Sequence, residues 1–365
     1  MITKTKKTHN FFAGPAVMPQ EALQRAYDEF FDFSGTGMSV MEISHRSKEF
    51  MAVNTEAQNL LRELLDIPDN YKILFLQGGA SLQFGMLPMN FLGEGKTADY
   101  ILTGGWSEKA MKEAKLFGTP KTAFTSKETN HNRIPKQEEL KLDPKAEYVH
   151  ITTNNTLYGT QWHFVPEVGN VPLVADMSSD MMWHKFDVKK YAMIYGGAQK
   201  NLGPSGVTVV IIREDFLAKC NSGLSTMLSY KTHAENDSLY NTPPTFGIYM
   251  LRNVLAWQKS IGGLNEVERR NRAKAKLIYD CIDKYPALYR GHSEKESRSL
   301  MNITFTMPTP ELEEKFLAEA KALNMVGIKG HRSVGGCRAS TYNALPLESA
   351  RALADFMEEF AKKNA

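Results

Sequence analysis

Cysteine is scarce in this chain of 365 residues, and long apolar runs are missing. The three cysteines, Cys220, Cys281 and Cys337, are odd in number and far apart, so they do not predict a disulfide framework. No apolar stretch approaches the roughly 20 residues that a membrane-spanning helix needs. We therefore expect a soluble protein of the cytoplasm that has no contact with a membrane.

A strong excess of charge is also absent. The formal net charge of +3 comes from the first ten residues, which hold three lysines and no acid. The balanced remainder of the chain does not predict a surface for nucleic acid. The basic start lacks the apolar segment of a secretory leader and is poor in arginine, so we expect residues 1–14 to form a frayed N-terminal tail.

Motifs of several familiar enzymes are missing as well. The nine histidines include no HExxH pair and no cysteine belongs to a CxxC, so we expect no bound metal. No GxSxG elbow indicates a serine hydrolase, and no GxGxxG follows a predicted strand as it would in a dinucleotide-binding protein.

The length and the 42% of hydrophobic residues predict two domains, because a single core rarely grows beyond roughly 250–300 residues. From about residue 70, apolar strands alternate with small-residue turns and helical stretches, which is typical of a mostly parallel α/β sheet. A charged amphipathic helix follows Gly262. We expect a large domain over residues 15–262 and a small α+β domain over residues 263–365. The strands that end in polar or glycine-rich turns are KILFLQ, ADYILT, AEYVHI and VPLVA.

Lys200 lies in the turn GGAQKNLGPSG, between two apolar strands. Ligands of parallel sheets bind beyond the carboxyl ends of the strands, where this turn is predicted to lie. A surface lysine is the commonest alternative. A P-loop is excluded because Gln199 precedes the lysine and Asn201 follows it. The remaining chemical role is that of a nucleophilic amine that forms a Schiff base.

Asp176 ends the apolar strand VPLVA, where a partly buried carboxylate needs a partner. One interpretation makes it the N-cap of a helix. In the other, it keeps the pyridine nitrogen of pyridoxal phosphate protonated, which makes the ring an electron sink. Lys200 and Asp176 together fit that cofactor.

Other turns of the predicted sheet offer further contacts for such a cofactor. Gly78 and Gly79 allow the backbone to approach closely, and free amides after them at a helix N-terminus suit a phosphate. Trp106 is either a packing residue or a ring that stacks on the cofactor. The remaining candidates are Ala80 and Ser81 for the phosphate amides, Thr156 for the phenolic oxygen and Gln199 for the phosphate.

Long colinear motifs, from FFAGPAVMP to the end of the chain, resemble the phosphoserine aminotransferase family. The resemblance implies a fold-type I enzyme that binds pyridoxal phosphate and works as a homodimer with shared active sites. It implies that Lys200 forms the Schiff base, that Asp176 binds the pyridine nitrogen, and that the other candidates above contact the cofactor. It also implies that Asn241 and Thr242 reach the phosphate of the neighbouring subunit. The motifs are MEISHRSKEF, QGGASLQF, NNTLYGTQW, DMSSD, GGAQKNLGPSGVTVVIIRED, NTPPTFGIYM and GHRSVGGCRASTYNALP.

One stretch departs from the family. Residues 181–188, MMWHKFDV, stand where members commonly carry a Ser-Arg-Pro stretch. The departure leaves the chemical residues unchanged. It bears on the packing of this loop and on part of the subunit contact.

His45–Arg46 and His331–Arg332 are two His-Arg pairs, and Arg338 follows the second pair in a glycine-containing loop. Singly, each is more often a surface charge, but together they suit an anionic substrate with two binding ends. The resemblance implies amino transfer from glutamate to 3-phosphohydroxypyruvate, giving 2-oxoglutarate and phosphoserine. It leaves open a further reaction with the phosphorylated four-carbon keto acid of vitamin B6 synthesis.

Two other functions stay open at this stage. A related fold-type I enzyme, such as a serine–glyoxylate-type aminotransferase or a cysteine desulfurase, would use the same cofactor. A desulfurase needs a mobile nucleophilic cysteine, and Cys337 beside Arg338 is better explained as a small packing residue. A non-catalytic anion-binding protein would use the glycine-rich turns and the arginines without any cofactor.

Overall fold

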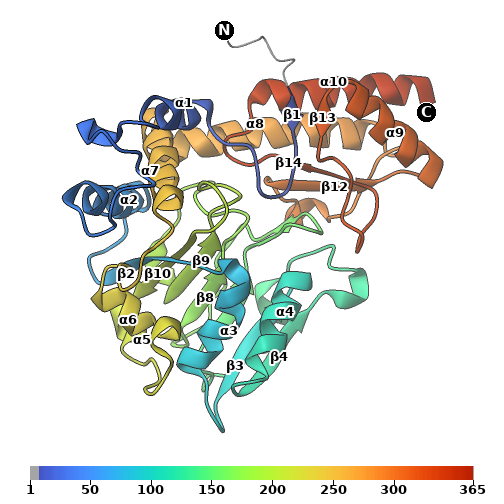
Figure 1. Ribbon diagram of the computed structural model, residues 1–365. Helices are drawn as coiled ribbons and strands as arrows, with labels where there is room; N and C mark the ends of the chain where they lie inside the picture. The colour runs from blue at the N-terminus through green and yellow to red at the C-terminus, as the bar shows by residue number, and fades with distance from the viewer. Residues whose placement is uncertain (1–7, 365) are drawn as a thin grey trace.

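The computed structural model describes residues 8–364, and its centre is a seven-stranded sheet (Figure 1). In spatial order the strands are β2 (Tyr71–Leu76), β10 (Thr208–Arg213), β9 (Met193–Gly197), β8 (Leu173–Asp176), β5 (Val149–Thr152), β3 (Thr97–Leu102) and β4 (Thr119–Thr125). Every strand but β10 runs in one direction, while β10 is antiparallel to both of its neighbours. The predicted mostly parallel sheet is confirmed.

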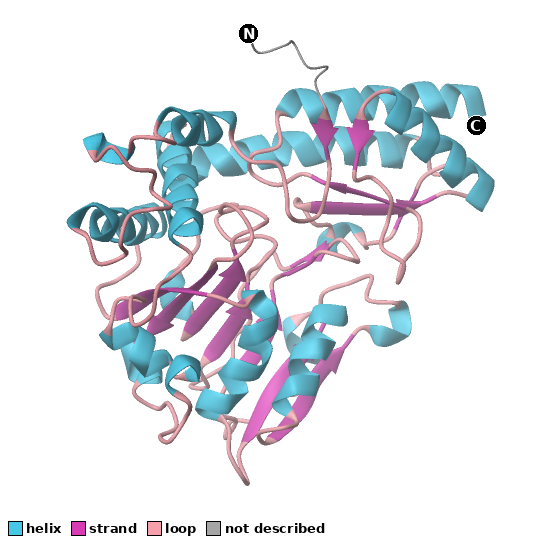
Figure 2. Cartoon of the chain, in the orientation of Figure 1, coloured by secondary structure: helices cyan, strands magenta, loops and turns pink. Residues whose placement is uncertain are grey.

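Helices cover both faces of this sheet (Figure 2). On β2, Ile73 and Phe75 belong to the core shared with α2 (Lys48–Leu65) and α7 (Thr245–Ser260). Leu74 and Leu76 belong instead to the core shared with α3 (Gly79–Phe91) and α4 (Gly105–Ala114). Successive side chains of a strand point to opposite faces, so a sheet covered on both faces needs strands that are apolar throughout. The remaining helices of this part are α1 (Gln20–Asp28), α5 (Glu214–Leu217), α6 (Tyr230–Glu235) and the 3-10 turns η1 (Phe33–Gly35), η2 (Lys127–Thr129), η3 (Gln137–Glu139), η4 (Val188–Lys190) and η5 (Thr226–Leu228).

The predicted alternation of strand and helix is only partly correct. Helices follow β2 and β3, but a hairpin of β6 (Asn154–Asn155) and β7 (Thr160–Gln161) follows β5, and turns follow β8. Asn154 donates to the hydroxyl of Ser179 at 2.8 Å, and that hydroxyl donates to the carbonyl of Asn154 at 2.8 Å. Short polar side chains that bond backbone groups compete with helix formation, which explains the turns.

The C-terminal elements form a smaller unit, drawn in orange and red above the sheet in Figure 1. The chain turns at Gly262, whose φ of 112° favours glycine, into α8 (Gly263–Lys284). An antiparallel sheet of β11 (Arg290–Gly291), β12 (Asn302–Thr306) and β14 (Cys337–Ser340) packs with η6 (Lys295–Ser297), α9 (Pro310–Ala322), β13 (Met325–Val326) and α10 (Leu347–Asn364). The turn coincides with the predicted domain boundary, and the division into 15–262 and 263–365 itself stays a prediction.

The N-terminal segment joins this smaller unit. Strand β1 (His9–Asn10) pairs in parallel with β13, and Phe11 is fully buried in the core of the C-terminal unit. The expectation of a frayed tail is therefore wrong from His9 onward, because the apolar side chain of Phe11 gains more from burial than the segment loses in freedom. For residues 1–7 the expectation lies outside the described residues.

Phe11→Ala should lower the free energy of unfolding by about 3–5 kcal/mol, because it leaves a cavity in the smaller core. The neighbouring Phe12 is 52% exposed, so Phe12→Ala is the matched control and should change stability by less than about 1 kcal/mol. Urea unfolding of the two variants measures the difference. Equal losses in the two variants would contradict the assignment of residues 9–11 to the C-terminal core.

Candidate active site

A pocket of about 390 Å³ lies at the carboxyl ends of the parallel strands, beside the first turn of α3. This is the sheet edge at which the sequence places its ligand site. The pocket is lined by Gly78, Gly79, Ala80, Ser81, Phe84, Trp106, Thr152, Asn154, Thr156, Asp176, Ser178, Ser179, Gly197, Gln199, Lys200, Gly206 and Val207. The predicted cofactor residues are therefore brought together, except for Asn241 and Thr242.

Lys200 lies in the turn after β9, and its Nζ donates to the hydroxyl of Thr156 at 2.8 Å. Burial lowers the pKa of the Lys200 amine to about 8. The carboxylate of Asp176 opposes this shift, and the positive charge of Arg338 adds to it. A lysine must lose its proton to act as a nucleophile or a base, so a lower pKa increases the reactive fraction near neutral pH.

Asp176 is the last residue of β8 and is 4% exposed. Its Oδ1 accepts hydrogen bonds from the backbone N–H and the hydroxyl of Ser178, at 2.9 and 2.5 Å. Burial raises the pKa of Asp176, and the bonds from Ser178 partly oppose this shift. No described α-helix begins here, so the N-cap interpretation of Asp176 is wrong. A buried carboxylate of this kind is best stabilised by a cationic partner in the pocket.

The turn between β2 and α3 forms a cradle for an anion. Gly78 and Gly79 have φ values of 82° and 63°, which strongly favour glycine. A Cβ on Gly78 would lie 2.7 Å from the side chain of Leu82, whereas a Cβ on Gly79 would meet nothing within 4 Å. No side chain caps the first turn of α3, which begins with Gly79, Ala80 and Ser81. Uncapped amides beside open space fit the phosphate that the sequence predicts here.

Trp106 supplies the aromatic surface of the pocket. It lies in the first turn of α4, with its ring 6.5 Å from that of Phe84 and with Lys109 Nζ 4.3 Å above it. Its indole N–H is buried and has no hydrogen-bond partner among the described residues. A flat ring in the pocket could stack on this indole. Together with Lys200, Asp176 and the glycine turn, these residues fit pyridoxal phosphate.

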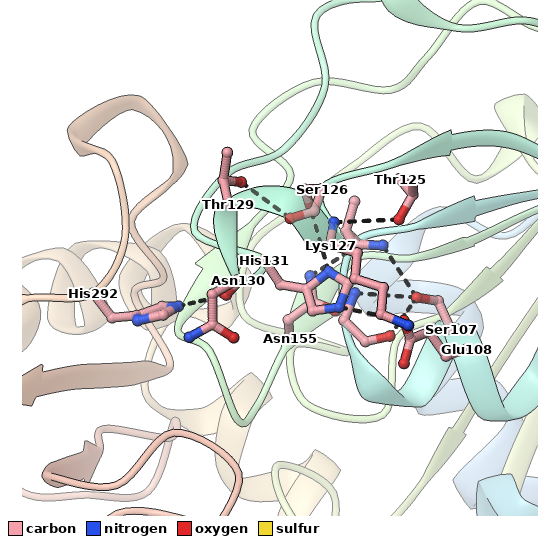
Figure 3. Close-up of polar contacts among 12 residues, drawn as sticks. Ser107, Glu108, Thr125, Ser126, Lys127, Thr129, Asn130, His131, Asn155 and His292 are labelled. Carbon is pink, nitrogen blue, oxygen red and sulfur yellow. Dashed lines mark hydrogen bonds and ion pairs between the residues drawn. The ribbon is translucent and has the colours of Figure 1, made fainter.

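Polar contacts hold the start of α4 in place (Figure 3). The hydroxyl of Ser107 accepts from the backbone of Thr103 at 3.1 Å and donates to the carbonyl of Gly104 at 2.7 Å. The next residue, Glu108, lies 3.5 Å from Nε2 of His131, whose Nδ1 lies 3.3 Å from the hydroxyl of Ser126. The pKa of His131 is lowered, chiefly by burial, which favours the neutral imidazole at neutral pH. Sequence reasoning missed this anchor because no motif links residues 108 and 131.

The C-terminal unit also contacts this anchor. Nε2 of His292 lies 2.9 Å from the carbonyl of Asn130, as Figure 3 shows. The ring of Tyr158 lies between the two histidines, at 4.9 Å from His131 and 5.7 Å from His292. The helix that carries Trp106 is therefore connected to both units.

Arg338 lies on strand β14, which corrects its predicted position in a loop. The correction follows from pairing, because Arg338 is opposite Thr304 in the antiparallel ladder with β12. Its Nη1 donates to the carbonyl of Thr156 at 3.3 Å, and its buried Nε has no partner among the described residues. This guanidinium is therefore available at the edge of the pocket for an anion.

His331 and Arg332 lie in the turn before β14, and Arg332 is exposed. Burial lowers the pKa of His331, and the positive charges of Arg338, Arg332 and Lys109 lower it further. These cations act on one another across a short distance, so the structure gathers positive charge on this side of the pocket.

His45, Arg46, Asn241 and Thr242 do not line the pocket of their own chain. His45 precedes α2 and has a buried Nε2 without a partner among the described residues, while Arg46 is exposed. Asn241 lines a separate hollow with Gln77. The roles assigned to these four residues stay predictions. The same holds for His331, Arg332 and Arg338, which are not among the lining residues either, and for the individual roles of the residues inside the pocket.

Comparison with known proteins shows the family to which the chain belongs. The model of the class-V aminotransferase family matches residues 8–353. A phosphoserine aminotransferase of Lysinibacillus sphaericus is 59% identical over 360 residues, which are 99% of this chain and 99% of that protein. The solved phosphoserine aminotransferase from Bacillus circulans subsp. alkalophilus has a TM-score of 0.97 at 52% identity and covers 99% of this chain and 100% of its own. The PLP-bound phosphoserine aminotransferase from Trichomonas vaginalis has a TM-score of 0.91 at 38% identity, covering 96% and 100%. The predicted fold class is confirmed.

His131→Ala should weaken the binding of pyridoxal phosphate to the apoprotein by about five- to tenfold, since it frees the start of α4 and removes interactions of about 1–1.5 kcal/mol. An absorbance titration of the apoprotein measures the dissociation constant. His292→Ala is the matched control and should change it by less than about twofold. A similar loss in both variants would assign the effect to the contact between the units and not to α4.

Proposed function

The chain belongs to the class-V aminotransferase family, and from that premise we propose that the protein is a phosphoserine aminotransferase dependent on pyridoxal phosphate. It exchanges an amino group between glutamate and 3-phosphohydroxypyruvate, giving 2-oxoglutarate and phosphoserine. The observation that carries the proposal is the pocket in which Lys200 and Asp176 lie beside a glycine cradle and Arg338. Relatives named for this activity match nearly the full chain, which supports the same assignment.

Pyridoxal phosphate, when bound, supplies an electron sink for the charge that develops at the α-carbon of the substrate. In the proposal, Asp176 keeps the pyridine nitrogen protonated, and the amides of Ala80 and Ser81 bind the phosphate. Trp106 stacks on the ring and excludes water. Lys200 Nζ takes the proton from the substrate α-carbon and later returns a proton, as a general base and then a general acid.

The two substrates share one end and differ at the other. We assign the common α-carboxylate to Arg338, whose guanidinium lies beside Thr156 at the edge of the pocket. The distal carboxylate of glutamate and the phosphate of phosphoserine fall to His331 and Arg332, together with His45 and Arg46. A planar guanidinium suits both anions, which explains how one site could accept both substrates.

A homodimer with shared active sites is part of the proposal. The segment from α1 to the start of α2, which includes His45 and Arg46, has large apolar side chains that face solvent in the single chain. Among them are Tyr27 at 74% and Phe31 at 83% exposure. Exposed apolar groups gathered on one segment are typical of an interface. A second copy of the chain on this surface would bring its own His45 and Arg46 to the pocket, together with its Asn241 and Thr242.

The competing functions have less support. A desulfurase would need Cys337 as a nucleophile, but this thiol is fully buried and burial raises its pKa far above the ordinary value. A non-catalytic anion-binding protein has no use for a half-buried lysine next to a buried carboxylate. We also place the protein in the cytoplasm, which agrees with three free, buried cysteines. None of the described helices is long and apolar enough to cross a membrane.

Lys200 gives a pH prediction for the apoprotein. The protonated amine is not a nucleophile, so the rate at which Lys200 captures pyridoxal phosphate should rise with pH and level off above the lysine pKa, about 8. Stopped-flow absorbance between pH 6 and pH 10.5 measures this rate. An ordinary lysine titrates near 10.4, so a rate still rising steeply at pH 10 would contradict the lowered pKa.

The arginines give a substrate prediction. Arg338→Ala should slow the half-reactions with glutamate, phosphoserine and alanine alike, by about ten- to a hundredfold, because charged hydrogen bonds contribute about 1.5–3 kcal/mol. Arg332→Ala and Arg46→Ala should slow the half-reactions with glutamate and phosphoserine but leave any slow half-reaction with alanine nearly unchanged. The half-reaction rate should fall more with phosphoserine than with glutamate, since the distal group of phosphoserine carries more charge.

The measurement is the decay of the cofactor absorbance when each holoenzyme variant is mixed with one amino acid. Alanine is the internal control, because it has an α-carboxylate and no distal anion. If Arg46→Ala and Arg332→Ala slowed alanine as much as phosphoserine, these arginines would have a structural role and the distal assignment would be wrong.

A further inference from the structure

A second pocket, of about 300 Å³, is lined by Thr153, Met177 and Asp180, the chain neighbours of three residues that line the catalytic pocket. It is bordered by the segments that follow β7 and β8 and by α8. Its lining residues are Thr153, Trp162, His163, Phe164, Val165, Met177, Asp180, Trp183, His184, Phe186, Tyr191 and Arg272. None of these residues has a part in the proposed transamination.

Aromatic rings form two continuous walls of this pocket. In one wall the ring of Trp162 lies 5.2 Å from that of Phe164. In the other, His184 lies 3.9 Å from Trp183 and 5.8 Å from Phe186. The stretch 181–188, where the sequence departs from the family it resembles, therefore supplies most of the second wall.

Asp180 is the one carboxyl group among the residues that line the pocket. Its side chain is 3% exposed, and its oxygens accept from Thr153 at 2.5 Å and from Gln161 at 3.2 Å. Burial raises the pKa of Asp180 to about 7, while the bonds from Thr153 and Gln161 and the charge of Lys200 oppose this shift. A cation in the pocket would stabilise the ionised carboxylate, so this site favours a ligand that brings positive charge.

Arg272 is the one arginine or lysine among the lining residues, and its guanidinium lies 5.6 Å from the centre of the Trp183 ring. Arg272 already pairs with Glu268 at 2.7 Å. Burial lowers the pKa of His163 and lowers that of His184 to about 4, so both imidazoles are neutral at pH 7. Aromatic faces and one carboxylate are the features by which proteins recognise substituted ammonium ions.

We propose that this second pocket binds a small organic cation of the quaternary ammonium class, with the aromatic walls around the cation and Asp180 as its counter-charge. The volume suits a ligand of this size, since small-molecule sites begin at roughly 300 Å³. The site is separate from the catalytic pocket but adjacent to it, because Thr153 also lies 3.1 Å from the carbonyl of Asp176.

The first test compares two probes on the unmodified holoenzyme by isothermal titration calorimetry. Choline is the cation, and 3,3-dimethylbutan-1-ol is its neutral isostere, with carbon in place of the charged nitrogen. Choline should bind at least about tenfold more tightly, because attraction to the rings and to Asp180 acts on the cation alone. Potassium chloride at equal concentration controls for ionic strength. Equal affinity for the two probes, or no heat from choline at tens of millimolar, would overturn the proposal.

Variants then test the two parts of the site. Asp180→Asn should abolish the preference for choline over the isostere, and Trp183→Leu should weaken choline binding. Asp187→Asn is the matched control, since Asp187 belongs to the same stretch but does not line the pocket, and it should keep the full preference. A preference that survives Asp180→Asn would overturn the assignment of the counter-charge. Tighter binding of benzoate than of choline would mark the pocket as an anion site at Arg272.

Discussion

The structure depends above all on a lysine amine that is kept partly out of water next to a buried carboxylate. Burial favours the neutral form of Lys200, while Asp176 favours the charged form. The balance of the two effects lowers the pKa of Lys200 to about 8. Neither residue could be held this way on a surface loop. Lys200 follows β9 and Asp176 ends β8, and these parallel neighbours have their carboxyl ends at one edge. The sheet therefore sets the distance between the two groups.

The rest of the fold stabilises that edge. Cores on both faces of the sheet keep the strand ends in register. The glycine turn before α3 and the anchored start of α4 place an uncapped helix N-terminus and an indole on either side of the pocket. Arg338, on β14 of the C-terminal unit, donates to the carbonyl of Thr156, which lines the same pocket.

Local chemistry made part of this arrangement predictable from the sequence. Lys200, Asp176 and the Gly78–Gly79 turn each stand at the end of an apolar run, where residue type and strand boundary together indicate a role. Long-range pairing was not predictable, because nothing near His9 in the sequence indicates Met325 as its partner. The strand that carries Arg338 could not be predicted either, because it depends on long-range pairing with β12. The helices expected after β5 and β8 do not form, because the side chains of Asn154 and Ser179 make hydrogen bonds to each other and to the backbone. The contacts that we propose for a second copy of the chain lie beyond any single-chain pattern, and the resemblance alone pointed to them.

The proposed function requires that Lys200 bonds covalently to pyridoxal phosphate in a working transaminase. Borohydride reduction of the purified holoenzyme followed by peptide mass mapping tests it most directly. We expect that the visible absorbance disappears, that a single pyridoxyl group is found on the peptide containing Lys200, and that prior addition of glutamate prevents this labelling. A colourless protein, or a label on any other lysine, would contradict it.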